Sequence, residues 1–121
     1  MSEQRIEPGS IGTQDVMSAI EFEAELRRVA RFDLRPPVAN PLAAAVQKIK
    51  DNPAFPQSRL LGRMLTALTY QRGEFRRAEV SALDAATLGL VIALMNSARA
   101  GTTGRDEWIN AVTAADAAAA G

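Results

Sequence analysis

The longest apolar stretch of the chain, residues 83–100, has no polar face when it is arranged as a helix. Within residues 88–95 only Gly89 interrupts a run of Leu, Val, Ile, Ala and Met. A helix that is apolar all round is normally enclosed by other elements. The pattern therefore predicts a buried central helix over about residues 84–100, with the rest of the chain packed around it.

The ends of this predicted helix carry residues that start and stop helices. Asp84 is a favourable N-cap, and Gly101 can adopt the left-handed conformation that ends helices. The run is shorter than the roughly 20 residues that span a bilayer and it ends in polar residues, so no membrane helix is expected. Small residues at the helical period predict a seam for internal packing or, as the alternative, for self-association. They are Ala82, Ala86, Gly89, Ala93, Asn96 and Ala100.

Two segments in the first half of the chain have the apolar spacing of amphipathic helices. The first is predicted to begin near Thr13 and to bury one face, formed by Ala19, Phe22, Leu26, Val29 and Ala30. The second begins at Asn40-Pro41, because Asn is a good N-cap and Pro fits the first helical position. Phe55 follows this second helix between two prolines and is expected to plug the core.

A third helix is predicted over about residues 58–71, followed by Gly73 as its C-terminal cap. Its apolar stripe is formed by Leu60, Leu61, Met64, Leu65 and Leu68. Residues 74–83 are interpreted as a short helix with Phe75 and Val80 turned inward, or alternatively as a linker to the central helix.

The C-terminal part of the chain predicts one more helix. Thr103, followed three residues later by Asp106, resembles a capping box in which Asp replaces Glu. The helix after it is predicted to turn four residues inward: Trp108, Ile109, Val112 and Ala115.

Together these segments predict an all-α fold, a compact bundle of four to six helices around the buried helix at about 84–100. The sequence shows no strand-like alternation and no internal repeat. Its 121 residues are enough for one domain with a hydrophobic core. We expect a flexible N-terminal tail over residues 1–12, a single helical domain over 13–116 and a frayed C-terminal tail over 117–121.

Composition excludes several kinds of chemistry. The chain has no cysteine and no histidine, which rules out disulfides, Cys/His zinc sites, Cys nucleophiles and His-based triads. Neither catalytic residues nor a cofactor or metal site is predicted, and we expect the protein not to be an enzyme. The first ten residues lack the pattern of a secretory signal, so a cytoplasmic protein without a membrane partner is expected.

The candidate interaction chemistry lies in a group of arginines. Arg59 and Arg63 are one helical turn apart, and three more flank the predicted turn at Gly73. The planar guanidinium suits carboxylates and phosphates because it donates two hydrogen bonds in parallel. We therefore predict an interaction surface formed by Arg59, Arg63, Arg72, Arg76 and Arg77.

Two functions are compatible with this surface. The preferred hypothesis is a small non-enzymatic helical module for protein–protein interaction or assembly, with a protein partner or a second copy in a homodimer. The alternative is a DNA-associated regulator in which a helix-turn-helix-like region at about 58–83 contacts phosphates through its arginines. The formal net charge of zero and the scarcity of aromatic residues make nucleic acid the less favoured partner.

Overall fold

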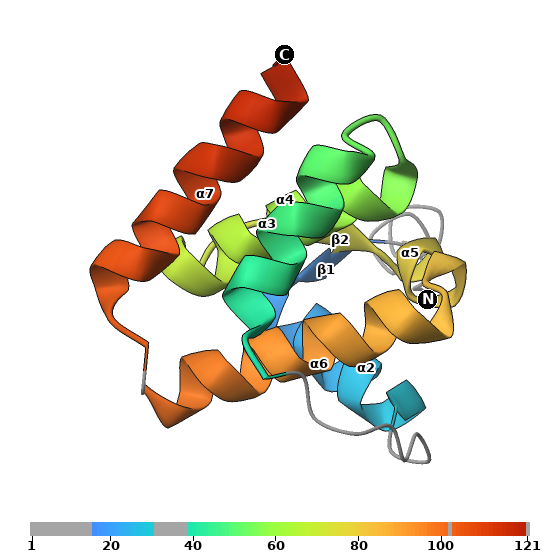
Figure 1. Ribbon diagram of the computed structural model, residues 1–121. Helices are drawn as coiled ribbons and strands as arrows, with labels where there is room; N and C mark the ends of the chain where they lie inside the picture. Colours follow the sequence, from blue (N-terminus) through green and yellow to red (C-terminus); the bar gives the residue numbers. More distant parts are fainter. Residues whose placement is uncertain (1–15, 31–38, 102, 121) are drawn as a thin grey trace, which may run out of the picture.

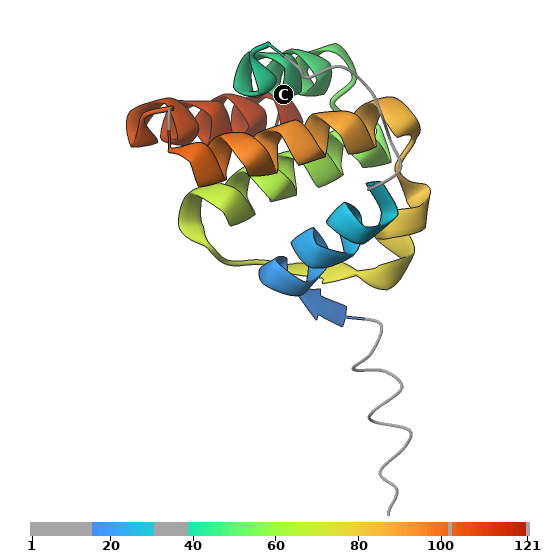
Figure 2. The same cartoon turned by 90° about the horizontal axis from the view of Figure 1, so that it is seen from below.

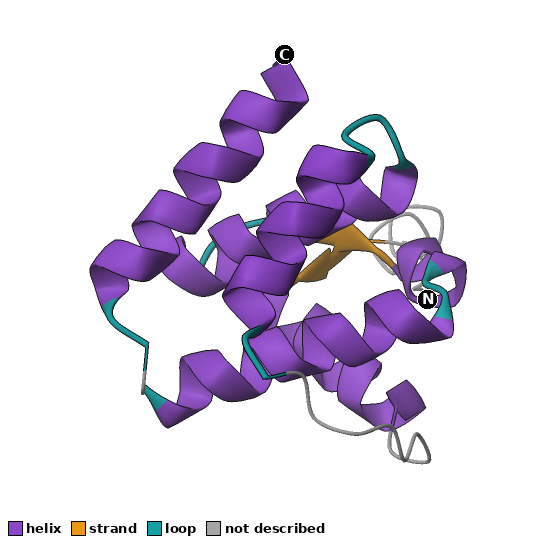
Figure 3. Cartoon of the chain, in the orientation of Figure 1, coloured by secondary structure: helices purple, strands orange, loops and turns teal. Residues whose placement is uncertain are grey.

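The computed structural model describes residues 16–30, 39–101 and 103–120. These residues form six helices and one two-stranded sheet, and the predicted all-α bundle is confirmed. The helices pack around one another (Figures 1 and 3), and the two short strands lie at one edge of the bundle (Figure 2). The elements are β1 (Val16–Ser18), α2 (Ala19–Ala30), α3 (Pro41–Asp51), α4 (Pro56–Tyr70), β2 (Glu74–Arg76), α5 (Arg77–Ala82), α6 (Ala85–Ala100) and α7 (Arg105–Ala120).

The predicted central helix is α6, and it begins and ends where its sequence indicates. The Asp84 carboxylate accepts a hydrogen bond from the backbone N–H of Thr87 at 2.7 Å. Gly101 closes the helix in the left-handed conformation with φ 67°. α6 packs against α2, α3 and α4, and Figure 2 shows it crossing the middle of the bundle.

The small residues of α6 lie on its outer side, which contradicts the predicted internal packing of the seam. The buried side is formed by larger residues: Thr87, Leu90, Val91, Leu94 and Met95. The predicted seam residues are exposed or half-buried: Ala82, Ala86, Gly89, Ala93, Asn96 and Ala100. α6 therefore buries one broad face, and self-association through its small residues stays a prediction.

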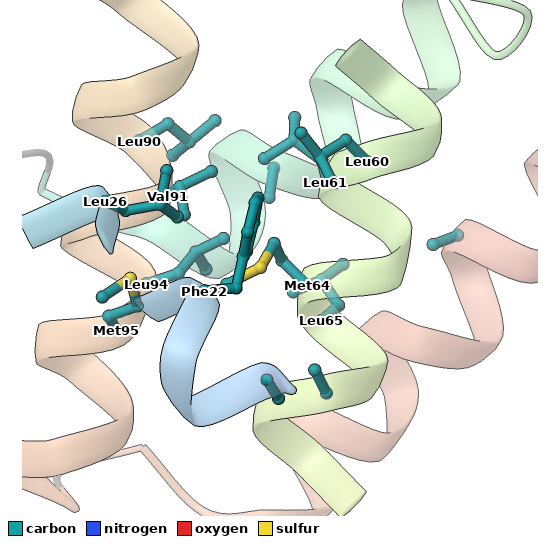
Figure 4. Packing of buried hydrophobic residues seen from close by; sticks show 14 of the residues in the cluster. Phe22, Leu26, Leu60, Leu61, Met64, Leu65, Leu90, Val91, Leu94 and Met95 are labelled. Carbon is teal, nitrogen blue, oxygen red and sulfur yellow. The ribbon is translucent and has the colours of Figure 1, made fainter. Parts of the chain in front are cut away.

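The core lies where α2, α4 and α6 meet (Figure 4). Phe22 and Leu26 of α2 are fully buried there, as are Leu61, Met64 and Leu65 of the predicted α4 stripe. Each large apolar side chain that is removed from water in this way stabilises the fold by about 1.5–3 kcal/mol. The apolar faces predicted from the helical period therefore form most of the core. Three of the predicted residues, Ala30, Leu68 and Ile109, are half-buried, and two exceptions are exposed.

The exceptions are Val29 and Phe55, which are 41% and 59% exposed. α2 reaches the core through its earlier turns, and Val29 lies in its last turn, at the surface. Phe55 is the residue before α4, and its backbone is extended because Pro56 follows it. The prediction that Phe55 plugs the core is wrong, since this turn carries its side chain outside the bundle.

The sheet is an element that the sequence pattern did not predict. β1 pairs antiparallel with β2, and Met17 lies opposite Phe75. These two residues are buried, while their neighbours in the strands are exposed. Because each strand has only three residues, the alternation is too short to be recognised in the sequence.

Because of the sheet, two helices have other bounds than the sequence predicted. The helix expected from near Thr13 begins at Ala19 as α2, although Thr13 itself lies outside the described residues. The short helix expected over 74–83 is divided into β2 and α5. Phe75 and Val80 are nevertheless both buried, as predicted.

Each strand leads directly into a helix that is capped by a glutamate. Ser18 and Glu21 form a capping box, in which the Ser18 N–H donates to the Glu21 carboxylate at 2.9 Å and the Glu21 N–H donates to the Ser18 hydroxyl at 3.2 Å. The Arg76 N–H likewise donates to the Glu79 carboxylate at 2.8 Å. The two strand–helix units therefore share one arrangement on either side of the Met17–Phe75 pair.

Two further predictions at helix ends are corrected. α4 ends at Gln71, which adopts the left-handed conformation with φ 57°, and not at Gly73. α7 is preceded by Gly104, whose N–H donates to the Glu107 carboxylate at 3.2 Å. The Thr103 hydroxyl instead lies 3.3 Å from that of Ser97, so the predicted Thr103–Asp106 box is not formed.

The remaining predictions concern the inward face of α7 and the two tails. Trp108, Val112 and Ala115 of α7 are buried, as predicted, whereas Ile109 is only half-buried and Ala111, which was not predicted, is buried. Residues 117–120 are helical, and fraying of this end stays a prediction. The predicted tail over 1–12 lies outside the described residues. In the described part of the chain, no helix is long and apolar enough to cross a membrane.

Candidate interaction groove

A groove of about 440 Å³ runs along the outer side of α4. One wall is the end of α7, which lies against α4 (Figure 1), and the other is the segment 72–75 that leads into β2. Its volume lies within the range of roughly 300–1,000 Å³ typical of ligand pockets. Three of the five predicted arginines line it: Arg59, Arg63 and Arg72.

Gly62 forms the open floor of the groove. It lies in the interior of α4, and a Cβ atom built on it would meet nothing within 4 Å. Glycine inside a helix costs roughly 0.5–1 kcal/mol relative to alanine, and no close packing within the described residues requires it here. Its effect is to leave the helix backbone accessible from the groove.

Arg63 fixes the 74–79 region to α4. Its guanidinium donates to the carboxylate of Glu79 and, at 2.7 Å, to the backbone carbonyl of Glu74. It also lies 4.9 Å from the centre of the Phe75 ring. Phe75 in turn stacks on Phe22, with ring centres 4.3 Å apart. Arg63 is therefore engaged in holding the fold together.

The carboxylate of Glu79 is stabilised in its charged form. Burial raises its pKa, but hydrogen bonds from Arg63 and from the backbone N–H of Arg76, with the charges of both arginines, outweigh burial. The net result is a pKa below the ordinary value of 4.5. At neutral pH both side chains of the Arg63–Glu79 pair are charged and their charges cancel. The pair therefore does not change the net charge of the groove.

Four other charged side chains on the groove rim have no charged partner among the residues that the structure describes. The side chain of Arg59 has neither a hydrogen bond nor an ion pair with any described residue, and Arg72 lies 5.3 Å from the centre of the Tyr70 ring. The carboxylates of Glu74 and Asp116 are likewise unpaired within the described ranges. The rim thus offers two positive and two negative groups to an occupant.

Arg76 and Arg77 lie away from the groove, at the junction of β2 and α5. Hydrogen bonds from Ser18 are the main reason why the pKa of Glu21 is lowered, and the charge of Arg77 contributes to the same shift. Arg77 therefore lies near α2. The structure divides the predicted arginine surface into a groove group and a group beside α5.

Gly62, Glu74 and Asp116 were not singled out in the sequence. A lone glycine inside a strongly periodic helix is a visible signal, because it lowers helix stability without an evident reason. Nothing local distinguishes Asp116 from other exposed acids. Its place on the groove depends on how α7 packs against α4.

The structure does not contain the helix-turn-helix outline predicted for about 58–83. A recognition helix follows its partner after a short turn and inserts into the major groove. Here β2 intervenes after α4, and α5 has only 6 residues. The physical reason is Phe75, which is drawn into the core against Phe22 and keeps this segment extended.

Comparison with known protein families, with curated proteins and with solved structures found no match. Among the residues that the structure describes, no group of three or more acidic side chains is placed to hold a metal ion. The function proposed below therefore rests on the geometry of the groove.

Proposed function

We propose that the chain is a small non-enzymatic module for protein–protein interaction or assembly, and that the groove along α4 is its docking site. The observation that carries this proposal is the open floor at Gly62 in a groove that is also lined by Arg59 and Arg72, neither of which has an ion pair within the described part of the chain. Arginine and aromatic side chains contribute most of the energy at protein interfaces. Phe55 and Tyr70, at the two ends of α4, do not line the groove but are 59% and 38% exposed, so both are accessible to a partner.

The DNA-associated alternative has less support from the same geometry. Phosphates entering the groove would meet the carboxylates of Glu74 and Asp116, and Arg63 is already paired with Glu79. Like charges at short range weaken binding, whereas nucleic-acid interfaces are strongly positive. We therefore favour a protein as the partner, either a different chain or a second copy.

We further propose the cytoplasm as the location, since a chain without cysteine suits a reducing compartment. A homodimer is one form of the proposed assembly. Sedimentation measurements over a range of concentrations give its mass directly and separate this form from binding of a different protein.

The proposal is tested by cross-linking in cells followed by capture of the tagged chain. Gly62→Met fills the groove without disturbing packing, because the space above Gly62 is open. Arg59→Glu reverses one unpaired rim charge. Lys50→Glu makes the same charge change at an exposed residue of α3 that does not line the groove.

We expect a specific protein to be captured by the native chain and by Lys50→Glu, and lost with Gly62→Met and Arg59→Glu. Melting temperatures of all four chains show whether each is folded. Unchanged capture by a folded Gly62→Met chain would contradict docking in the groove.

A further inference from the structure

The unpaired charges on the groove rim are of both signs. Arg59 and Arg72 are positive, Glu74 and Asp116 are negative, and none of them forms an ion pair within the described part of the chain. An occupant that carries only carboxylates would satisfy the two arginines and place its charges beside two acids. An occupant that carries both signs would satisfy all four groups, and such complementarity determines which partner is accepted.

The size of the groove limits the occupant to a short segment. About 440 Å³ accommodates a few side chains and not the face of a folded domain. The segment must also approach α4 closely to fill this space. Gly62 permits that approach, because no side chain stands between the helix backbone and the groove.

Resting on the proposed function, we infer that the groove takes a short segment of a partner protein that carries both a carboxylate and a basic side chain. The carboxylate lies at Arg59 or Arg72, and the basic group lies at Glu74 or Asp116. The backbone of the segment passes over Gly62. This inference adds the chemistry of the occupant to the docking site.

The test is selection from a library of short random peptides displayed on phage, with the native chain as bait. Peptides that also bind the folded Gly62→Met chain are removed, so that those retained depend on the groove. Binding of the retained peptides is then measured by fluorescence polarisation, with versions in which the acid, the base or both are neutralised.

The expected result is that the retained peptides contain at least one acid and one base. Neutralising either group should weaken binding about tenfold, because each makes a charge-assisted contact. The double variant Glu74→Gln with Asp116→Asn should weaken binding of the mixed peptide and strengthen binding of a purely acidic one. Lys50→Glu serves as the control and should leave both affinities unchanged.

Two outcomes overturn the inference in distinguishable ways. If the retained peptides are purely acidic, the occupant chemistry is wrong, while docking in the groove stands. If no peptide distinguishes the native chain from Gly62→Met, both the inference and the proposed function are wrong.

Discussion

Gly62 shows how one missing side chain shapes the candidate site. It lies on the outer stripe of α4 with Arg59 and Thr66, where any larger residue would reduce the groove. The helix loses some stability at this position, because glycine is more flexible than alanine in the unfolded chain. A residue that lowers the stability of the fold, and that no packing contact requires, is typical of a functional site.

Gly62→Ala is expected to raise the free energy of unfolding by about 0.5–1 kcal/mol. The added methyl group meets nothing within 4 Å and restricts the unfolded chain. Urea unfolding of the two proteins measures the difference. A decrease in stability would mean that α4 does not have open space at this position.

At the scale of elements, Arg63 joins α4 to both β2 and α5. Its contacts with Glu79, with the Glu74 carbonyl and with the Phe75 ring join three consecutive elements. The same arginine was predicted to be part of an interaction surface because it lies one turn from Arg59. Sequence spacing identifies a shared helix face, but it does not indicate which charge will meet a partner from a distant segment.

Arg63→Ala is expected to lower the free energy of unfolding by about 1–3 kcal/mol, since it removes a charge-assisted hydrogen bond and a cation–π contact. Arg59→Ala, one turn away, is the matched control. It should change stability by less than about 0.5 kcal/mol, because the Arg59 side chain has no hydrogen bond or ion pair with a described residue. Equal effects in urea unfolding would refute the different roles assigned to the two arginines.

The pH dependence of stability tests the Glu79 cap of α5. Its pKa is lower in the folded protein than the ordinary 4.5, so the folded state favours the charged form. This contribution is present at neutral pH and is lost as the pH falls from about 4.5 through the folded pKa.

Glu79→Gln should therefore reduce stability at pH 7 and make the remaining stability fall less steeply on acidification. Urea midpoints measured from neutral to acidic pH give both quantities. Glu74→Gln is the control, since its carboxylate has no partner among the described residues. An acid slope identical to that of the native chain would show that Glu79 is not stabilised as proposed.

At the scale of the whole molecule, the sequence predicted what depends on local pattern. The central helix, its caps at Asp84 and Gly101 and the inward faces of α4 and α7 all follow from helical periodicity and capping. The pairing of β1 with β2 could not be predicted in this way, because each strand has only three residues and its alternation of buried and exposed positions is too short to recognise. The groove could be predicted only in part, since its arginines are visible in the chain, whereas Asp116 reaches it through the packing of α7.

The overall charge balance leads to a prediction about nucleic acid. The chain has a net charge of zero, and the groove carries acids among its arginines. We expect a generic DNA duplex to bind weakly even at low salt. Fluorescence polarisation at two salt concentrations measures this, and a steep loss of strong binding with salt would instead support several phosphate contacts.

The composition of the groove also has a consequence for when it becomes functional during synthesis. Its walls come from the middle of the chain and from Asp116 near the end of the sequence. Chains emerge from the ribosome in order, so α4 and β2 are available well before α7. A nascent chain in which α7 has not yet emerged presents an incomplete groove, so a partner that docks there distinguishes chains in which α7 is folded from chains in which it is not.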